Sequence, residues 1–161
     1  MGAFPKLAGQ KPTYLEAALA AYVEGERESG IMATVATGLS DEAMAALALY
    51  YAGLPAGGAP SAPPDPAAVE RGRRIAMEGV PERKVPACSD CHGPAPEEKN
   101  PHYPRLAGQY APYLELQLEL FSKGVRGGSA YAHLMQEVAP ELEPEEMRDV
   151  AAFYASLPPE R

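Results

Sequence analysis

A repeated segment constrains the fold of this chain more than any other feature of its sequence. FPKLAGQ at residues 4–10 returns as YPRLAGQ at residues 103–109, an offset of 99. Extended to residue 27, this alignment gives 11 identities in 24 positions, and an offset of 103 pairs residues 32–55 with 135–158 at another 11 of 24. Because self-similarity of this extent indicates two units of one design, the chain is predicted to hold two related domains.

Only the second copy has a front end ahead of the repeated segment. This front end covers residues 67–102, and its equivalent in the first copy would begin some 33 residues before Met1. We therefore expect a partial repeat at 1–57, a semi-stiff Pro/Gly-rich linker at 58–66 and a complete domain at 67–161.

Apolar periodicity predicts an all-α architecture. Apolar residues recur at helical spacing in five segments, and the stretches between them are expected to be loops. These segments are residues 14–22, 41–54, 67–78, 113–122 and 144–157. The 18 Pro and 15 Gly residues also argue against strands that alternate with long crossovers.

The charge of the chain excludes one class of partner. The formal net charge is −8, and both halves of the sequence carry the acidic excess. Without a basic stripe, the chain lacks the electrostatic attraction that drives nucleic-acid binding. No apolar run approaches the ~18 residues needed to cross a bilayer, and the start does not resemble a signal peptide. We expect a soluble chain that is either cytoplasmic or already processed.

The chemistry of the second copy centres on residues 88–92, CSDCH. Two thiols three positions apart emerge on the same side of one helical turn, where they can add to the two vinyl groups along a porphyrin edge. His92 follows directly, so that its imidazole is placed to supply an axial ligand to the iron. The pattern indicates covalent attachment of c-type haem through Cys88 and Cys91.

Other interpretations of this pattern remain open from the residues alone. A zinc site needs about four ligands, and the two cysteines with His92, His102 and His133 match no familiar spacing. A thioredoxin-type dithiol would follow a strand, and no strand pattern precedes Cys88. The pentapeptide can also occur by chance with no cofactor. His102 is more simply an exposed loop histidine than a ligand.

With the residues around CSDCH, the chain resembles class I cytochrome c, and its tandem copies look like the two-domain cytochrome c4. VERGRRIA at 69–76 is similar to the first helix of that family, in which Gly72 would allow a close helix crossing. PRLAG at 104–108 resembles the loop whose proline carbonyl accepts the Nδ1 proton of the ligand histidine. The resemblance implies an all-α cytochrome c fold. It also implies that the Pro104 carbonyl accepts the Nδ1 proton of His92 and that Leu106 forms part of the wall of the haem pocket.

The resemblance also implies the second axial ligand. Met135, within HLMQEVA, matches the distal methionine of the family, and His133 is its competitor for the iron. Met147 lies on a helical stripe, which assigns it to packing. Arg105 and Arg126 suit either haem propionates or an ordinary surface role.

The function implied by this resemblance is periplasmic electron transfer, on one covalent haem c with His92 and Met135 as axial ligands. Attachment of haem outside the membrane implies an export signal that has been removed or omitted. Expected partners are membrane respiratory complexes, dehydrogenases or terminal oxidases. The alternatives are a haem enzyme, either a peroxidase or a sulfur-compound oxidoreductase with a labile Met135, and a structural module without haem.

The first copy departs from the family pattern, because it lacks both CxxCH and a first helix while keeping Met32. One interpretation is that the chain begins partway into a diheme protein, in which case a second haem would require residues upstream of Met1. The other is that this copy is a haemless packing partner of the second. Its apolar face includes Leu47 and Tyr50. We expect this face to be covered by the second domain, by an upstream segment or by another chain, as in a homodimer.

Overall fold

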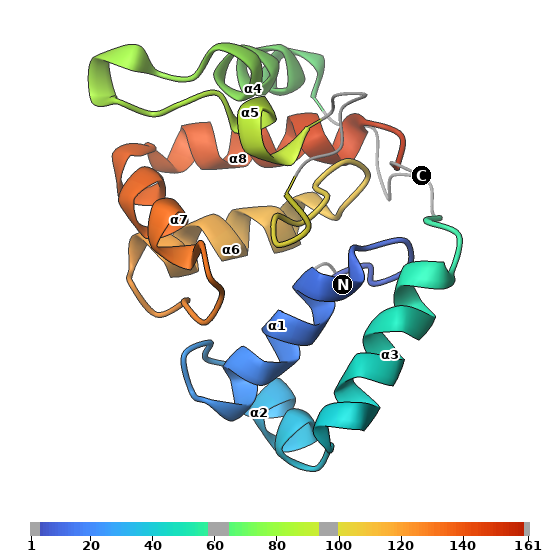
Figure 1. Cartoon of the computed structure of the whole chain (residues 1–161). Helices are drawn as coiled ribbons and strands as arrows, with labels where there is room; N and C mark the ends of the chain where they lie inside the picture. Colours follow the sequence, from blue (N-terminus) through green and yellow to red (C-terminus); the bar gives the residue numbers. More distant parts are fainter. Residues whose placement is uncertain (1–3, 58–64, 94–99, 160–161) are drawn as a thin grey trace.

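The computed structural model describes residues 4–57, 65–93 and 100–159 (Figure 1). Its helices are α1 (Pro12–Val23), α2 (Gly30–Thr37), α3 (Asp41–Gly53), α4 (Pro66–Glu78), α5 (Cys88–His92), α6 (Ala111–Ser122), α7 (Ala132–Val138) and α8 (Pro144–Ser156), with 3₁₀ turns η1 (Pro81–Arg83) and η2 (Ala139–Glu141). The predicted all-α architecture is confirmed. None of the described helices is long and apolar enough to cross a membrane. Most of the predicted linker, residues 58–64, lies outside the described residues.

The helices repeat with the sequence. α1 and α6 are related by the offset of 99 at both ends, and α3 and α8 by the offset of 103 at both ends. Figure 1 shows α1, α2 and α3 grouped on one side of the molecule and α4 to α8 on the other. We refer to these groups as the N-terminal half, residues 4–57, and the C-terminal half, residues 65–159.

All five predicted helices are present, with boundaries within two residues of the prediction. The prediction that only loops connect them is wrong, because α2 and α7 form at equivalent places in the two halves. Both are too short to be stable alone. Both ends of α7 are held by burial, since Ala132 at its start and Ala139 just after its end pack against Phe121 of α6. Tertiary packing, rather than a strong periodic pattern, therefore stabilises this helix.

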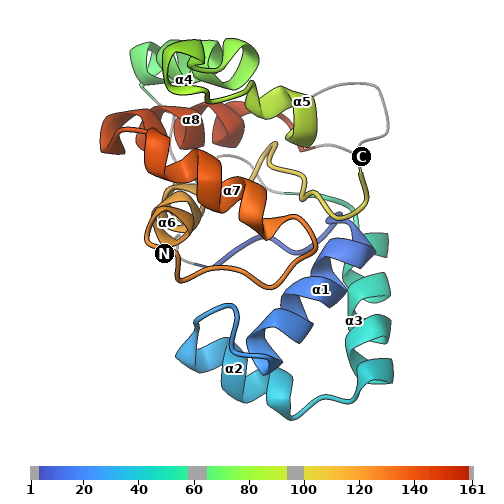
Figure 2. The ribbon, with the colours of Figure 1, turned by 60° about the vertical axis from the view of Figure 1, so that its left-hand side comes forward.

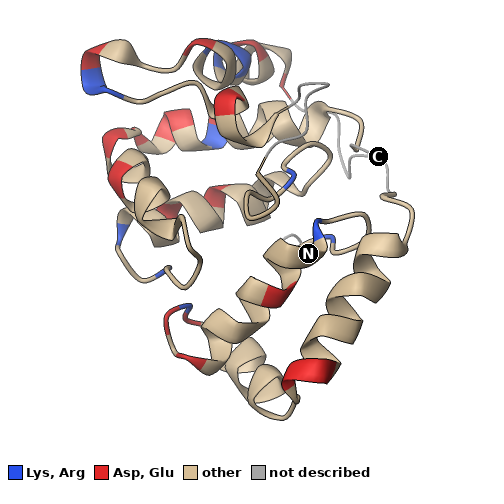
Figure 3. Cartoon of the chain, in the orientation of Figure 1, with Lys and Arg blue, Asp and Glu red and all other residues tan. Residues whose placement is uncertain are grey.

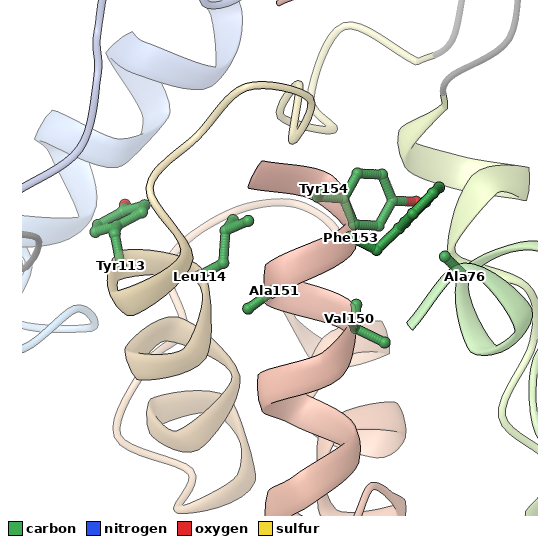
Figure 4. Packing of buried hydrophobic residues seen from close by; sticks show 7 residues of the cluster. All are labelled: Ala76, Tyr113, Leu114, Val150, Ala151, Phe153 and Tyr154. Carbon is green, nitrogen blue, oxygen red and sulfur yellow. The ribbon is translucent and has the colours of Figure 1, made fainter. Parts of the chain in front are cut away.

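The core of the C-terminal half forms where α4 and α6 pack against α8 (Figure 4). Its buried cluster consists of Ala76, Tyr113, Leu114, Val150, Ala151, Phe153 and Tyr154. α4 crosses α8 at Gly72, where an added Cβ would lie only 1.9 Å from the Asp149 carbonyl oxygen. Beside this crossing, Arg71 donates two hydrogen bonds to the buried Asp149 carboxylate, at 2.6 and 2.8 Å. The close helix crossing at Gly72 is therefore present.

Replacing Gly72 by alanine is expected to lower the free energy of unfolding by about 3 kcal/mol, because the new methyl group meets backbone atoms that cannot rotate away. This loss exceeds the gain of up to about 1 kcal/mol in helix propensity. Denaturant titration of the two proteins measures the difference. Gly53→Ala is the matched control, because nothing lies within 4 Å of a Cβ at Gly53. Equal stability of the Gly72 variant and the parent would contradict the assigned crossing.

The two halves meet through pairs of equivalent residues. The side-chain amide of Gln109 accepts from the Lys6 backbone N at 2.8 Å and donates to its O at 3.0 Å. Gln10 binds the backbone N and O of Arg105 in the same way, at 2.8 and 3.0 Å. Because Gln10 matches Gln109 and Lys6 matches Arg105 in the repeat, the interface has approximate two-fold symmetry. A cavity of about 30 Å³ lies here, room for water and little else.

The N-terminal half leaves an apolar face in solvent. Val150 and Phe153 of α8 are 5% and 6% exposed because α4 covers them. Their equivalents on α3, Leu47 and Tyr50, are 36% and 61% exposed. The expectation that the C-terminal half covers this face is therefore wrong for these two side chains. Covering by another chain, as in a homodimer, stays a prediction.

Candidate functional site

The two cysteines lie on the single helical turn α5, Cys88–His92. Both are free thiols and half-buried. The turn ends at Gly93, whose φ of 78° is readily adopted only by glycine. The Gly93 carbonyl accepts a hydrogen bond of 2.8 Å from the buried Tyr154 hydroxyl, which ties the turn to α8. The thiols are thus presented by a short turn that is anchored to the core.

His92, the last residue of α5, is oriented by the loop that follows residue 100. Its Nδ1 lies 2.9 Å from the Pro104 carbonyl oxygen. A carbonyl only accepts, so Nδ1 carries the proton, and among the described residues Nε2 makes no hydrogen bond. Burial, helped by the charges of Lys11 and Arg126, lowers the pKa of His92 despite the opposing bond to Pro104. The ring is therefore held neutral with its Nε2 lone pair available to a metal.

The structure disfavours the zinc and dithiol interpretations of CSDCH. Among the described residues, no group of three or more His, Cys, Asp or Glu side chains could hold a metal ion. A reactive dithiol needs a lowered thiol pKa. Burial instead raises the pKa of Cys88 to about 11. Because the described residues ahead of Cys88 form helices and no β-strand, a thioredoxin-type motif does not fit.

Aromatic rings bring the histidine loop next to α7. The Tyr103 ring lies 6.0 Å from the His92 ring and 5.2 Å from that of Tyr131, the residue before α7. Figure 2 shows α7 below α8, with the loop that leads into α6 near the lower end of α7. Met135 lies on α7, half-buried against the cluster of Phe121, Ala132 and Ala139, whereas His133 is exposed. The prediction of a loop between residues 122 and 144 is therefore wrong at Met135, because α7 fixes its backbone.

The other residues singled out in the sequence lie around this region. Leu106 packs against the core cluster that Cys88 also contacts. Arg105 lies at the interface and donates to the Gly9 carbonyl of the other half. His102 is not the exposed loop histidine that we expected. It is half-buried, and its Nδ1 is the buried side-chain atom that finds no hydrogen-bond partner among the described residues.

Two arginines are buried where the halves meet. Arg126 is 7% exposed, so its ordinary surface role is excluded. Arg27, which was not among the residues expected to form the site, is 6% exposed. Its pairing with Arg126 at the offset of 99 is the sequence signal that could have pointed to it.

These features fit a haem with covalent thioether links and an axial histidine. Cys88 and Cys91 supply the free thiols, and His92 supplies a neutral imidazole whose orientation is fixed. The unpartnered His102 Nδ1 and the buried arginines are suited to an anionic group, such as the propionates of haem.

The profile of the family described as cytochrome c matches residues 69–158, more than half of the chain. The chain belongs to the cytochrome c family. It is 36% identical over 155 residues to the "Thiosulfate dehydrogenase electron acceptor" of Thiomonas intermedia, covering 96% of this chain and 71% of that relative. As a member of the family, this cytochrome carries covalently bound haem c and serves in electron transfer.

Two solved structures share the fold of this cytochrome. One is a cytochrome c4 from Acidithiobacillus ferrooxidans, with a TM-score of 0.83, 34% identity, and coverage of 95% of this chain and 89% of that chain. The other is a thiosulfate dehydrogenase from Marichromatium purpuratum, with a TM-score of 0.85, 37% identity, and coverage of 96% of this chain and 32% of that chain. The similarity extends over both halves, which supports the resemblance to tandem cytochromes c4.

Proposed function

We propose that this cytochrome is a one-electron carrier whose iron is held between His92 and Met135. The observation that carries the proposal is the hydrogen bond from His92 Nδ1 to the Pro104 carbonyl, which directs Nε2 away from the loop. Met135 is assigned to the other axial position, because the contacts among the His92, Tyr103 and Tyr131 rings bring α7 close to His92. His133 is exposed and is the weaker candidate.

This ligand set favours electron transfer over substrate chemistry. When bound, haem c supplies an iron that changes between the ferric and ferrous states by one electron. A histidine and a thioether on opposite faces leave no coordination position for a substrate. The soft thioether sulfur also favours the ferrous state and raises the reduction potential relative to two imidazoles. The chain's own contribution is to hold both ligands rigidly, through Pro104 and through α7.

We further propose a periplasmic location and a dehydrogenase as electron donor. Haem attachment outside the membrane, which the resemblance implies, supports the location. The relative named as a thiosulfate dehydrogenase electron acceptor and the similar structure of a thiosulfate dehydrogenase support the donor class. In this proposal, the donor is an enzyme that oxidises an inorganic sulfur compound, and the acceptor is a membrane complex or a terminal oxidase.

Rapid mixing of the ferrous protein with carbon monoxide, and of the ferric protein with cyanide, tests the proposal. A carrier with both axial positions filled is expected to bind these ligands slowly or not at all, and to show an iron–sulfur charge-transfer band. Mixing the ferric protein with a thiosulfate dehydrogenase and thiosulfate tests the donor, and reduction of the haem is expected. Fast ligand binding by the protein as isolated would instead favour the haem enzyme, a peroxidase or sulfur-compound oxidoreductase.

A further inference from the structure

In the N-terminal half of this acidic molecule, the basic residues lie where it meets the C-terminal half (Figure 3). The first 65 residues hold only three basic side chains, and all of them donate hydrogen bonds to the C-terminal half. Lys6 and Lys11 donate to the carbonyls of Gly108 and Asn100. The partners of Arg27 in the C-terminal half are the side chains of Tyr113 and Gln117.

Arg27 and Arg126 are related by the symmetry of the interface. Their backbones form an antiparallel bridge. Arg27 Nη2 donates to the Tyr113 hydroxyl at 2.8 Å, and Arg126 Nη2 donates to the Tyr14 hydroxyl at 3.0 Å. Because Tyr14 is the equivalent of Tyr113, each arginine binds the tyrosine of the opposite half. The arrangement places two guanidinium groups together at the centre of the interface.

Both guanidinium groups are buried without a carboxylate. Arg27 also donates to the Gln117 amide oxygen at 3.1 Å and lies over the Tyr22 ring, and Arg126 lies over the Phe121 ring. Throughout the described ranges, neither makes an ion pair with Asp or Glu. Burying a charge without a partner of opposite sign costs several kcal/mol. An anion at this place would therefore stabilise both charges.

The tyrosines and arginines at this place act on one another: despite burial, the phenols of Tyr14, Tyr113 and Tyr22 raise the pKa of Arg27. Burial would raise the pKa of Tyr14, but the charges of Arg126 and Arg27 outweigh it and lower the pKa to about 8. Burial also lowers the pKa of Arg126 itself. A phenol is thus the nearest group able to become an anion, and at neutral pH it stays mostly protonated.

Arg126 lies beside the part of α7 that carries Met135. Its guanidinium group stacks 4.3 Å above the centroid of the Phe121 ring, which belongs to the cluster that Met135 packs against. Its backbone carbonyl also accepts a hydrogen bond of 2.9 Å from Gln136, the neighbour of Met135. Because the backbones of the two arginines are bridged, both lie next to the helix that carries the proposed ligand Met135.

We propose that Arg27 and Arg126 together pair with the propionate carboxylates of the haem on Cys88 and Cys91, so that the N-terminal half supplies one of the charges of the haem site. The inference rests on the proposed function. A guanidinium group matches the geometry of a carboxylate and stays charged when buried. A fixed positive charge beside the haem disfavours the ferric state, so both arginines raise the reduction potential. This role gives the half that lacks CxxCH a direct part in tuning electron transfer.

The midpoint potential of the holoprotein, measured by spectroelectrochemistry, tests this pairing. Arg27→Met is expected to shift the ferric/ferrous equilibrium about tenfold toward the ferric form, a lowering of about 59 mV for one electron. Arg27→Lys keeps the charge and is expected to keep most of the potential. Tyr113→Phe is the matched control, because it removes the hydrogen bond to Arg27 but not the charge, and its potential is expected to stay near that of the parent.

Two results would overturn the pairing while leaving the proposed carrier intact. The first is a reversible one-electron couple with the same potential in the parent, Arg27→Met and Arg126→Met. The second is a difference between parent and Arg27→Met that disappears at high phosphate concentration, since the counter-charge would then be a solvent anion. If Arg27→Met does not fold, Arg126→Met and Arg27→Lys carry the comparison. A parent chain without any haem couple would overturn both the pairing and the proposed function.

Discussion

Replacing His92 by alanine is expected to abolish the low-spin absorption spectrum of the attached haem. The thioethers at Cys88 and Cys91 are independent of this side chain, so the haem remains bound to the protein. What is lost is the strong-field nitrogen ligand, which the Pro104 carbonyl holds in one tautomer and one orientation. Absorption and electron paramagnetic resonance spectra of the ferric protein measure the change.

The matched control for this variant is His133→Ala on α7. His133 is exposed, so its removal is expected to leave the spectrum and the stability within error of the parent. The opposite pattern, a low-spin spectrum that survives His92→Ala and disappears in His133→Ala, would show that the proximal ligand is misassigned. Loss of the low-spin spectrum in both variants would assign both axial positions to histidine and remove Met135 from the site.

Exchanging Met135 for histidine is expected to lower the reduction potential by well over ~59 mV. For a one-electron couple, about 59 mV corresponds to a tenfold change in the equilibrium constant. Axial ligands tune haem potentials within a window of about 0.8 V, and a thioether holds the ferrous state better than a second imidazole does. Met135→Ala is expected to keep the haem but to bind cyanide and carbon monoxide rapidly. Spectroelectrochemistry and rapid mixing measure these two effects.

Met147→Leu is the control for the methionine variants. Met147, on α8, is 5% exposed and packs against Val85 and Leu142. A near-isosteric core change of this kind costs about 1 kcal/mol of stability, and the spectrum is expected to stay unchanged. If the iron–sulfur charge-transfer band survives Met135→Ala and vanishes in Met147→Leu, the assignment of the distal ligand is wrong.

The sequence allowed the main helices to be predicted because their signals are local. Pro66 and Gly79 bracket α4, and the apolar stripe from Met147 to Leu157 defines α8. The CSDCH turn was equally local, since both thiols and the imidazole lie within five residues. The repeat predicted that the two halves would share helices, and the offsets hold at the ends of α1, α3, α6 and α8.

Features that depend on contacts between distant residues were not predictable in this way. α2 and α7 are short and are stabilised by packing, so periodicity did not reveal them. His102 looks like a loop histidine until Tyr131 is placed beside it, with the two rings 5.7 Å apart. The burial of Arg27 arises from a half of the molecule that carries no CxxCH, and its partner Tyr113 lies 86 residues away. These contacts exist only in the folded arrangement, between residues that are far apart in the sequence.

Intact mass of the purified holoprotein, measured together with haem absorption under denaturing conditions, tests the central claim most directly. The account predicts one covalent haem for each 161-residue chain, and none in the variant that carries both Cys88→Ala and Cys91→Ala. A parent mass without a haem increment, or a haem increment that persists in the double variant, would contradict covalent attachment through these two thiols. Two haem increments in the parent would contradict a single site.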